Sequence, residues 1–229
     1  MLSIIIPTLN EAGEIAATLR SLQILRARGH EVIVVDGGSA DATLGVARPW
    51  SDHIVRTGNG RARQMNAGAA IARHSMLLFL HADTRLPESA DRLILEHCSD
   101  AADQCWGRFD IRLSGAAWTL RVVAFMMNWR SRLSGIATGD QAIFVSRSLF
   151  DAAGGFPEIA LMEDLALSKR LKRLARPRCL RERVESSSRR WEKNGAMRTI
   201  LLMWRLRLAY RCGASPHLLA KIYAGQQHR

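Results

Sequence analysis

The sequence predicts an α/β fold in which helices cover a mixed, mostly parallel central sheet, with further helices at the C-terminal end of the chain. Three observations predict this fold: short apolar runs alternate with helical patterns over residues 1–85, polar loops follow the apolar runs, and apolar segments rich in arginine close the chain. A length of 229 residues and a hydrophobic fraction of 48% are typical of one globular domain and argue against disorder.

The individual elements follow from the spacing of apolar residues. Within residues 11–28 apolar side chains recur every three or four positions, which predicts an amphipathic helix that Gly29 ends. Residues 163–173 have acidic side chains in the first turn and basic ones in the last, as the helix dipole favours. Strands are predicted at residues 2–6, 31–35, 53–56, 75–80, 106–113 and 142–145. Further helices are predicted from Asp41, over 61–73 and 116–133, and as two segments of 196–224 that break around Gly213 and Pro216.

The net charge of +12 is concentrated in the second half of the chain. Residues 1–114 carry 12 Lys and Arg against 13 Asp and Glu, whereas residues 115–229 carry 21 against 8. The second half is therefore expected to face a negatively charged partner. Phosphates, anionic lipid headgroups and nucleic acid all meet this description, and composition does not choose among them.

Cysteine spacing and the N-terminal sequence indicate the cellular compartment. None of the four cysteines forms a C-x-x-C pair, so we expect reduced thiols of a cytoplasmic protein at Cys98, Cys105, Cys179 and Cys212. Residues 1–7 lack the basic start of a secretory signal. The most apolar stretches, 118–129 and 200–210, are shorter than a membrane span and contain arginine. We expect a soluble protein or one that is peripheral on the inner face of the cell membrane.

Polar residues follow three of the predicted strands. Residues 8–11, 36–39 and 81–84 are such segments, and carboxyl ends of parallel strands meet at one edge of a sheet, where ligands bind. Asp83 after an apolar strand suits Mg²⁺ or Mn²⁺ shared with a diphosphate, or else caps a helix that begins near Pro87. Asp36 either receives donors from a base or ribose or forms an Asx turn before the glycines.

Three further clusters have a functional and a structural interpretation. Arg61, with Arg63 beside it, begins a helix and binds phosphate or forms a solvated basic face. Glu163 and Asp164 begin another helix, where one is a general base or both simply complement the helix dipole. Arg190 and Trp191 join a cation to an aromatic ring that binds a phosphate-bearing product or a sugar, unless the tryptophan is only an anchor.

In order and spacing, these segments resemble the family 2 glycosyltransferases. The resemblance extends from residue 2 to about residue 192 and rests on residues 4–11, 34–43, the Asp83 loop and the pair Glu163–Asp164. Residues 60–68 and 79–84 are similar to a branch of small stand-alone bacterial members. The resemblance implies a glycosyltransferase A-type fold over 1–229. Its parts would be a Rossmann-like nucleotide-sugar-binding half (1–85), an acceptor and catalytic half (86–192) and a helical tail (193–229).

The resemblance also implies a role for each matching residue. Asp164, with Glu163 beside it, is the implied base, and Gly139, Asp140 and Gln141 are the implied floor of the acceptor site. Arg190 and Trp191 remain from a Gln-x-x-Arg-Trp box at residues 187–191. The implied donor-nucleotide residues are Pro7, Thr8, Asn10, Glu11, Asp36, Ser39, Arg61 and Asp83.

The metal motif departs from the family pattern. Asp83 is the implied ligand of Mg²⁺ or Mn²⁺, but His81 replaces the first acidic residue of the usual Asp-x-Asp and removes one negative charge. A neutral imidazole is still a possible second ligand or a donor to phosphate. The implied reaction is one inverting displacement, in which a sugar moves from a nucleoside diphosphate to a hydroxyl of a lipid or small-molecule acceptor.

The basic second half suggests how a lipid acceptor is reached. Trp118, Trp129 and Trp204 are interspersed with Arg121, Arg130, Arg205 and Arg207, a composition that suits an anionic membrane surface. The alternative places these tryptophans in the core and the arginines in solvent.

Three rival functions remain at this point. A sugar nucleotidyltransferase would carry a glycine-rich basic loop where residues 7–11 stand. A nucleic-acid-binding protein is suggested by charge alone, and because no reading motif accompanies it, no nucleic-acid partner is expected. A catalytically degenerate nucleotide-binding protein is suggested only by His81.

Overall fold

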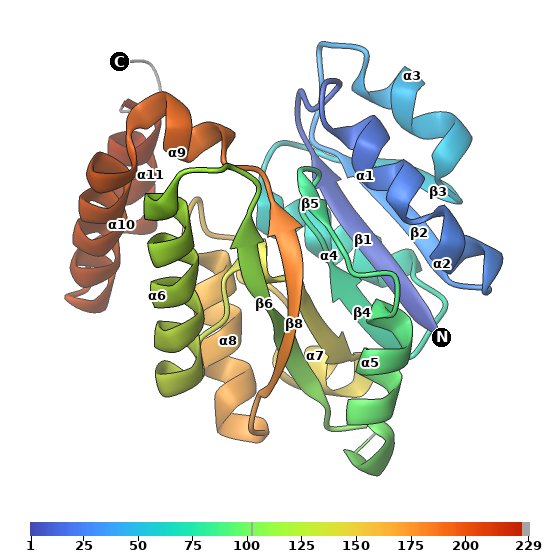
Figure 1. The fold of residues 1–229 in the computed structure, drawn as a ribbon. Coiled ribbons are helices and arrows are strands. Elements are labelled where there is room, and N and C mark those ends of the chain that lie inside the picture. The colour runs from blue at the N-terminus through green and yellow to red at the C-terminus, as the bar shows by residue number, and fades with distance from the viewer. Residues whose placement is uncertain (102, 226–229) are drawn as a thin grey trace.

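A computed structural model describes residues 1–101 and 103–225, apart from the side chains of Arg190, Asn194 and Ala196. One curved sheet forms the centre and helices lie on both of its faces (Figure 1). The last three helices, α9, α10 and α11, pack together beside α6 at one end of the molecule. The expected α/β architecture with C-terminal helices is thereby confirmed.

The sheet has the strand order β3-β2-β1-β4-β7-β6-β8-β5. The first four strands in this order are parallel, whereas β7 is antiparallel to both of its neighbours, β4 and β6. Strand β6 then pairs in parallel with β8, and β5 pairs antiparallel with β8. The strands are β1 (Leu2–Thr8), β2 (Glu31–Asp36), β3 (His53–Arg56), β4 (Met76–Phe79), β5 (Thr84–Arg85), β6 (Trp106–Leu113), β7 (Ile143–Ser146) and β8 (Arg178–Ser186).

The helices predicted from the sequence are present, but the first of them is interrupted. The helix expected over 11–28 is two short helices that meet at Leu22. The α-helices are α1 (Ile15–Ser21), α2 (Gln23–Ala27), α3 (Thr43–Ala47), α4 (Arg61–Ile71), α5 (Ala90–His97), α6 (Trp118–Ser134), α7 (Arg147–Ala152), α8 (Glu163–Leu174), α9 (Arg189–Asn194), α10 (Ala196–Arg211) and α11 (Pro216–Gly225). Three 3₁₀ turns complete the described elements: η1 (Arg48–Trp50), η2 (Ser99–Ala101) and η3 (Gly139–Gln141).

The alternation of β1 side chains divides the core into two layers. Ile4 and Ile6 pack with α1, α5 and α6 on one face of the sheet, whereas Ile5 packs with α4, α7 and α8 on the other. All three side chains are fully buried. A strand buried on both faces reads as a continuous apolar run, which explains why the first strand is the clearest in the sequence.

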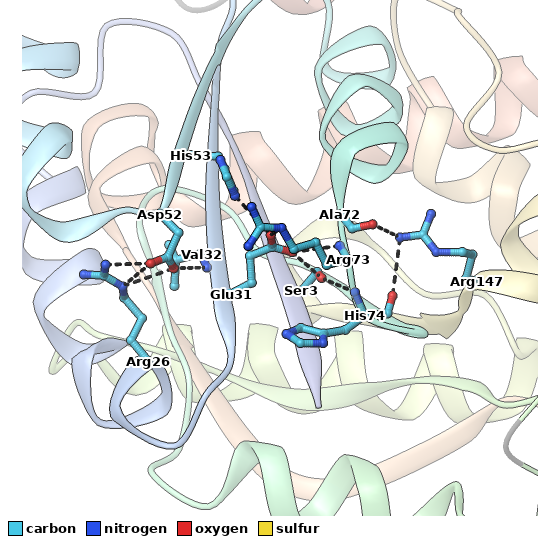
Figure 2. Close-up of polar contacts among 10 residues, drawn as sticks. All are labelled: Ser3, Arg26, Glu31, Val32, Asp52, His53, Ala72, Arg73, His74 and Arg147. Carbon is cyan, nitrogen blue, oxygen red and sulfur yellow. Dashed lines mark hydrogen bonds and ion pairs between the residues drawn. The ribbon is translucent and has the colours of Figure 1, made fainter.

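The amino ends of the parallel strands carry a structural polar network (Figure 2). Glu31, which begins β2, accepts hydrogen bonds from the Ser3 hydroxyl at 2.7 Å and from the Arg73 amide at 3.0 Å. The Arg147 guanidinium donates to the Ala69 carbonyl at 2.9 Å and also to those of Ala72 and His74. Because these groups hydrogen-bond within the network, they stabilise this end of the sheet. A ligand site is expected at the opposite end, beyond the carboxyl ends of the parallel strands.

The expectation of four reduced cysteines is wrong for two of them. Cys98 and Cys105 form a disulfide across the turn η2, with their Cα atoms 5.5 Å apart. The turn folds the chain back on itself, and both residues are buried beside the core, so a seven-residue separation becomes a contact. Cys179 and Cys212 are free thiols, as expected.

Candidate functional site

A cavity of about 610 Å³ lies at the edge of the sheet where β1, β4, β6 and β8 end. Because β7 is antiparallel, its first residue, Ile143, lies opposite the last residue of β4, Phe79. The turn η3 before β7 therefore reaches the same edge as the loop after β4. Of the predicted site residues, the cavity is lined by Pro7, Glu11, Arg61, His81, Asp83, Asp140 and Trp191.

Two loops on the predicted nucleotide side are tied to each other. The amide of Asn10 donates to the Ser39 hydroxyl at 2.9 Å, and the Asn10 side-chain oxygen accepts from the Ala40 amide at 2.9 Å. Asn10 adopts a left-handed conformation (φ 55°), a strained one that persists where surrounding contacts enforce it. These contacts fix the relative position of the loops that follow β1 and β2.

Asp36 forms the Asx turn that was one of its two interpretations. Its carboxylate accepts the amides of Gly38 and Ser39 at 3.0 Å and also the Ser39 hydroxyl. Asp36 and Thr8 are both buried and do not line the cavity, so their direct contact with a nucleotide stays a prediction. The hydrogen bonds of Asp36 and Thr8 fix the shape of the loops that border the cavity.

Gln64 is a positioning residue that the sequence-based assignment did not single out. Its side-chain amide donates at 2.8 Å to the carbonyls of Thr8 and Val35, which belong to neighbouring strands. Helix α4 thereby clamps the carboxyl ends of β1 and β2 and holds Arg61, at its own first turn, at the cavity. In the sequence, the signal for this role was a polar residue at a position on the apolar face of the predicted helix.

The cavity places two carboxylates where a divalent cation would be attracted. Burial raises the pKa of Glu11, the nearby Asp83 carboxylate raises it further, and Arg189 opposes both effects. No cluster of three His, Cys, Asp or Glu residues suited to a metal occurs among the described residues. The two carboxylates suit Mg²⁺ or Mn²⁺ only when diphosphate oxygens supply further ligands to the ion, which is the usual arrangement for Mg²⁺ at phosphates.

His81 is joined to the predicted acceptor floor. Its Nδ1 lies 3.2 Å from an Asp140 carboxylate oxygen. A Cβ at Gly139 would lie 2.3 Å from His81 Nε2, so only glycine lets the η3 turn pass so close to the imidazole. Asp83 does not cap the next helix, because α5 begins at Ala90. The structure thus brings the metal motif and the Gly139–Gln141 turn into contact.

Asp164 lies behind the cavity lining and is held by the backbone. Its carboxylate oxygens accept the Gly139 amide at 2.9 Å and the Leu165 amide at 2.7 Å. The residue that precedes the pair, Met162, is buried in a left-handed conformation (φ 72°), and Ala142 after η3 is also left-handed (φ 49°). Strained non-glycine residues thus flank both acidic segments of the site.

Glu163 is buried beside Asp164. Burial raises the pKa of Glu163, the Asp164 carboxylate raises it further, and Arg61 opposes both from 3.8 Å. An acid whose folded-state pKa is raised binds its proton more tightly in the folded chain. The stability that this proton provides is complete at low pH and is lost as pH rises from the ordinary value towards the raised one.

We expect Glu163→Gln to stabilise the chain at neutral pH, since it removes the cost of a buried, ionised carboxyl while keeping its shape. A gain of about 1 kcal/mol would raise Tm by about 2–4 °C in a chain of this size. Thermal denaturation from pH 4 to pH 8 checks this: the advantage over the unmodified chain should grow with pH. An advantage that is constant with pH would contradict it.

The end of the predicted Gln-x-x-Arg-Trp box is only partly described. Trp191, on α9, lines the cavity, whereas the side chain of Arg190 lies outside the described part of the chain. Gln141, the last residue of η3, is fully buried and does not line the cavity. The Thr138 amide donates to its side-chain oxygen at 3.2 Å. A direct role of Gln141 toward an acceptor stays a prediction.

The cavity walls formed by α6 and α10 include residues placed elsewhere by the sequence analysis. Arg130 and Arg207 were grouped with a basic surface, but nitrogen atoms of both guanidinium groups are buried and both residues line the cavity. The tryptophans of that group are surface residues: Trp118, Trp129 and Trp204 are 70%, 53% and 58% exposed. Among residues 1–101 and 103–225, no helix has the length and apolar character that crossing a membrane requires.

Curated relatives share part of this chain. A protein of Mycobacterium bovis (strain BCG / Pasteur 1173P2) named PGL/p-HBAD biosynthesis glycosyltransferase is 34% identical over 173 residues, or 68% of this chain and 63% of the relative. An uncharacterized glycosyltransferase of Haemophilus influenzae is 33% identical over 99 residues, or 41% of this chain and 33% of the relative. The chain therefore spans less than two thirds of the length of these relatives.

Solved structures share the fold. S. aureus TarS 1–349 in complex with UDP-GlcNAc superposes with a TM-score of 0.65 at 19% identity, over 81% of this chain and 58% of that one. The mannosyltransferase PcManGT from Pyrobaculum calidifontis, in complex with GDP-Man and Mn²⁺, gives 0.63 at 21% identity, over 91% and 60%. The sequence pattern of glycosyl transferase family 2 matches residues 3–150. The chain therefore belongs to glycosyl transferase family 2.

Proposed function

We propose that this protein transfers a sugar from a nucleoside-diphosphate sugar to an acceptor hydroxyl, with inversion at the anomeric carbon. The observation that carries the proposal is that one cavity is lined both by the predicted donor residues Glu11, Arg61 and Asp83 and by Asp140 of the predicted acceptor floor. Family membership and nucleotide-sugar complexes of proteins with this fold support it.

The residues divide into a donor group and an acceptor group. On the donor side, Arg61 supplies a cation toward the diphosphate, and the tied loops of Asn10 and Ser39 border the nucleotide. On the acceptor side, Asp164 accepts the proton of the attacking hydroxyl as the sugar–phosphate bond breaks. Backbone amides hold its carboxylate in place, so that it needs no rearrangement before reaction.

Asp83 would hold Mg²⁺ or Mn²⁺ together with the donor diphosphate, with Glu11 close by. When bound, such an ion neutralises charge on the departing nucleoside diphosphate. His81 carries no negative charge, and its Nδ1 lies 3.2 Å from an Asp140 carboxylate oxygen. We therefore propose that the metal binds together with the nucleotide rather than before it. The Mn²⁺ complex of PcManGT supports a metal at this fold.

The proposal is tested by thermal denaturation with UDP, GDP, CDP and dTDP, each with and without Mn²⁺. A ligand at about 100 times its Kd adds about 2.7 kcal/mol, which is readily measured. We expect one of the four nucleoside diphosphates to raise Tm, and to raise it more strongly when Mn²⁺ is present. A cooperative melt that none of the four shifts would contradict a nucleotide-sugar donor and favour a degenerate or unrelated function.

The surfaces of α6 and α10 support a second part of the proposal, peripheral contact with an anionic membrane. Large apolar side chains are exposed along both helices: Trp118, Val122, Phe125, Met126, Trp129 and Leu133 on α6, and Met197, Leu201, Trp204 and Leu208 on α10. We call these residues the apolar surface. The two helices lie side by side (Figure 1), and exposed arginines such as Arg121 and Arg205 accompany them. Aromatic and basic residues together favour the interface of an anionic bilayer.

We expect the protein to sediment with phosphatidylglycerol vesicles at low salt and to be released at about 0.5 M salt, because screening weakens the arginine contribution. Replacing Phe125 and Trp129 with serine should reduce retention at least tenfold, whereas Leu174→Ser, an exposed apolar residue on α8, should not. Equal retention on neutral vesicles, or none on either kind, would exclude electrostatic membrane contact.

A further inference from the structure

The inner part of the cavity between α6 and α10 combines apolar walls with two arginines. Arg130 comes from α6 and Arg207 from α10, and both line the cavity together with Met127 and Met203 of the same helices. Since the two helices pack against each other, the two guanidinium groups are brought together by tertiary structure and not by sequence proximity. Nothing in the donor chemistry described above uses this pair.

The two guanidinium groups have donors without acceptors. Nε and Nη2 of Arg130 and Nε of Arg207 are buried, and none of the three has a hydrogen-bond partner within the part of the chain that the structure describes. A buried donor left unpaired costs about 1–3 kcal/mol. Three such donors on two residues that line one cavity indicate that an acceptor-rich group completes the site when it binds.

Electrostatics place the pair on the acceptor side of the cavity. The pKa of Arg130 is lowered to about 10, chiefly by burial and next by the positive charge of Arg207. The carboxylates that favour the charged forms of both arginines are Asp140 and Asp164, not the donor-side Glu11 or Asp83. Two cations that repel each other near the acceptor floor are a site for an anion, and guanidinium groups match phosphate oxygens in charge and geometry.

The apolar wall continues from this pair to the molecular surface. Val122, Met126 and Trp204 line the cavity, yet they are 48%, 46% and 58% exposed and belong to the apolar surface. A ligand with its charged group at the arginines can therefore lay an apolar chain along α6 and α10 without burying a polar group. A free anion would leave these walls without a partner.

We propose that Arg130 and Arg207 bind the phosphate group of a lipid acceptor whose apolar chain lies against α6 and α10. This inference rests on the proposed function, because it names the chemical class of the acceptor that the transferase uses. The phosphate neutralises the two arginines and meets their unpaired donors. The hydrocarbon chain occupies the apolar wall and extends to the apolar surface, and through it towards a membrane.

Binding of decyl phosphate, measured by isothermal titration below its micelle concentration, tests the proposal on the full chain. We expect decyl phosphate to bind at least tenfold more tightly than 1-decanol, which lacks the phosphate, and at least tenfold more tightly than inorganic phosphate, which lacks the chain. Arg130→Met and Arg207→Met keep the aliphatic stem and should each weaken decyl phosphate at least tenfold. Their affinity for 1-decanol should not change.

Exposed arginines on the same helices provide matched controls. Arg121→Met on α6 and Arg205→Met on α10 should bind decyl phosphate as the unmodified chain does. If a Met variant does not melt cooperatively, Arg130→Lys and Arg207→Lys replace it, and they should lose affinity because the planar fork is gone.

Titration with a nucleoside diphosphate and Mn²⁺ separates this inference from the proposed function. The Arg→Met variants should retain that affinity. If they lose it while decyl phosphate binding persists, the pair serves the donor and the inference is wrong. Equal binding of inorganic phosphate and decyl phosphate would exclude a lipid as the source of the phosphate.

Discussion

Asp164→Asn is expected to abolish transfer to a hydroxyl acceptor, lowering kcat by about 10²–10⁴-fold, the contribution that a positioned general base makes. The variant keeps a side-chain oxygen that can accept the Gly139 amide, so the fold should persist. It removes the group that takes the proton. Single-turnover sugar transfer, together with Tm and nucleotide affinity, measures the effect.

Asp140→Asn provides the decisive comparison for this prediction. Asp140 lines the cavity and contacts His81, whereas Asp164 is one layer behind it. If Asp164 is the base, Asp140→Asn should change acceptor KM more than kcat. If instead Asp140→Asn loses kcat and Asp164→Asn keeps it, the proton acceptor is Asp140.

Asp83→Asn should lower transfer by about 10²–10³-fold and remove the effect of Mn²⁺ on nucleoside-diphosphate affinity. The reason is that an amide oxygen is a much poorer ligand for a hard divalent cation, and such an ion provides several kcal/mol of charge stabilisation. Asp83 lines the cavity, and its carboxylate accepts only a long hydrogen bond of 3.4 Å from the Thr84 hydroxyl within the described part of the chain, so little structure depends on it.

The affinity of Asp83→Asn for UDP or GDP, measured with and without Mn²⁺, checks this prediction. A nucleoside without phosphate should bind Asp83→Asn and the unmodified chain equally. Glu96→Gln, an exposed carboxylate on α5, is the control and should behave as the unmodified chain. Retained dependence on Mn²⁺ in Asp83→Asn would assign the metal to other ligands, with Glu11 the first candidate because its carboxylate lies near Asp83.

The position of the predicted donor residues at one end of the sheet could be predicted from the sequence because the signal for it is local. An apolar run followed by polar residues identifies the end of a buried strand, and parallel strands bring such ends to one edge. On that basis Glu11 and Asp83 were expected at the cavity, and they line it. Asp36 shows the limit of this reasoning, since an Asx turn and a ligand contact have the same local sequence.

Other features were missed because their local signal is weak or because they depend on contacts between distant segments. Strand β8 escaped prediction because its side chains at 181–183 are exposed and charged, so apolar alternation is weak there. The pairing of Cys98 with Cys105 follows from the turn between them. Arg130 and Arg207 are 77 residues apart in sequence, and only the packing of α6 on α10 reveals that they share a cavity.

The antiparallel course of β7 has a consequence for how substrate choice can diverge. The residues proposed for the donor lie on the loops after β1, β2 and β4 and at the start of α4. Those proposed for the acceptor lie on the turn before β7 and on helices outside the sheet. The two sets meet at one edge yet belong to separate stretches of chain. On the proposed assignment, a duplicated gene could exchange its C-terminal helices and keep the residues proposed for the donor, so acceptor preference would be the more readily altered trait.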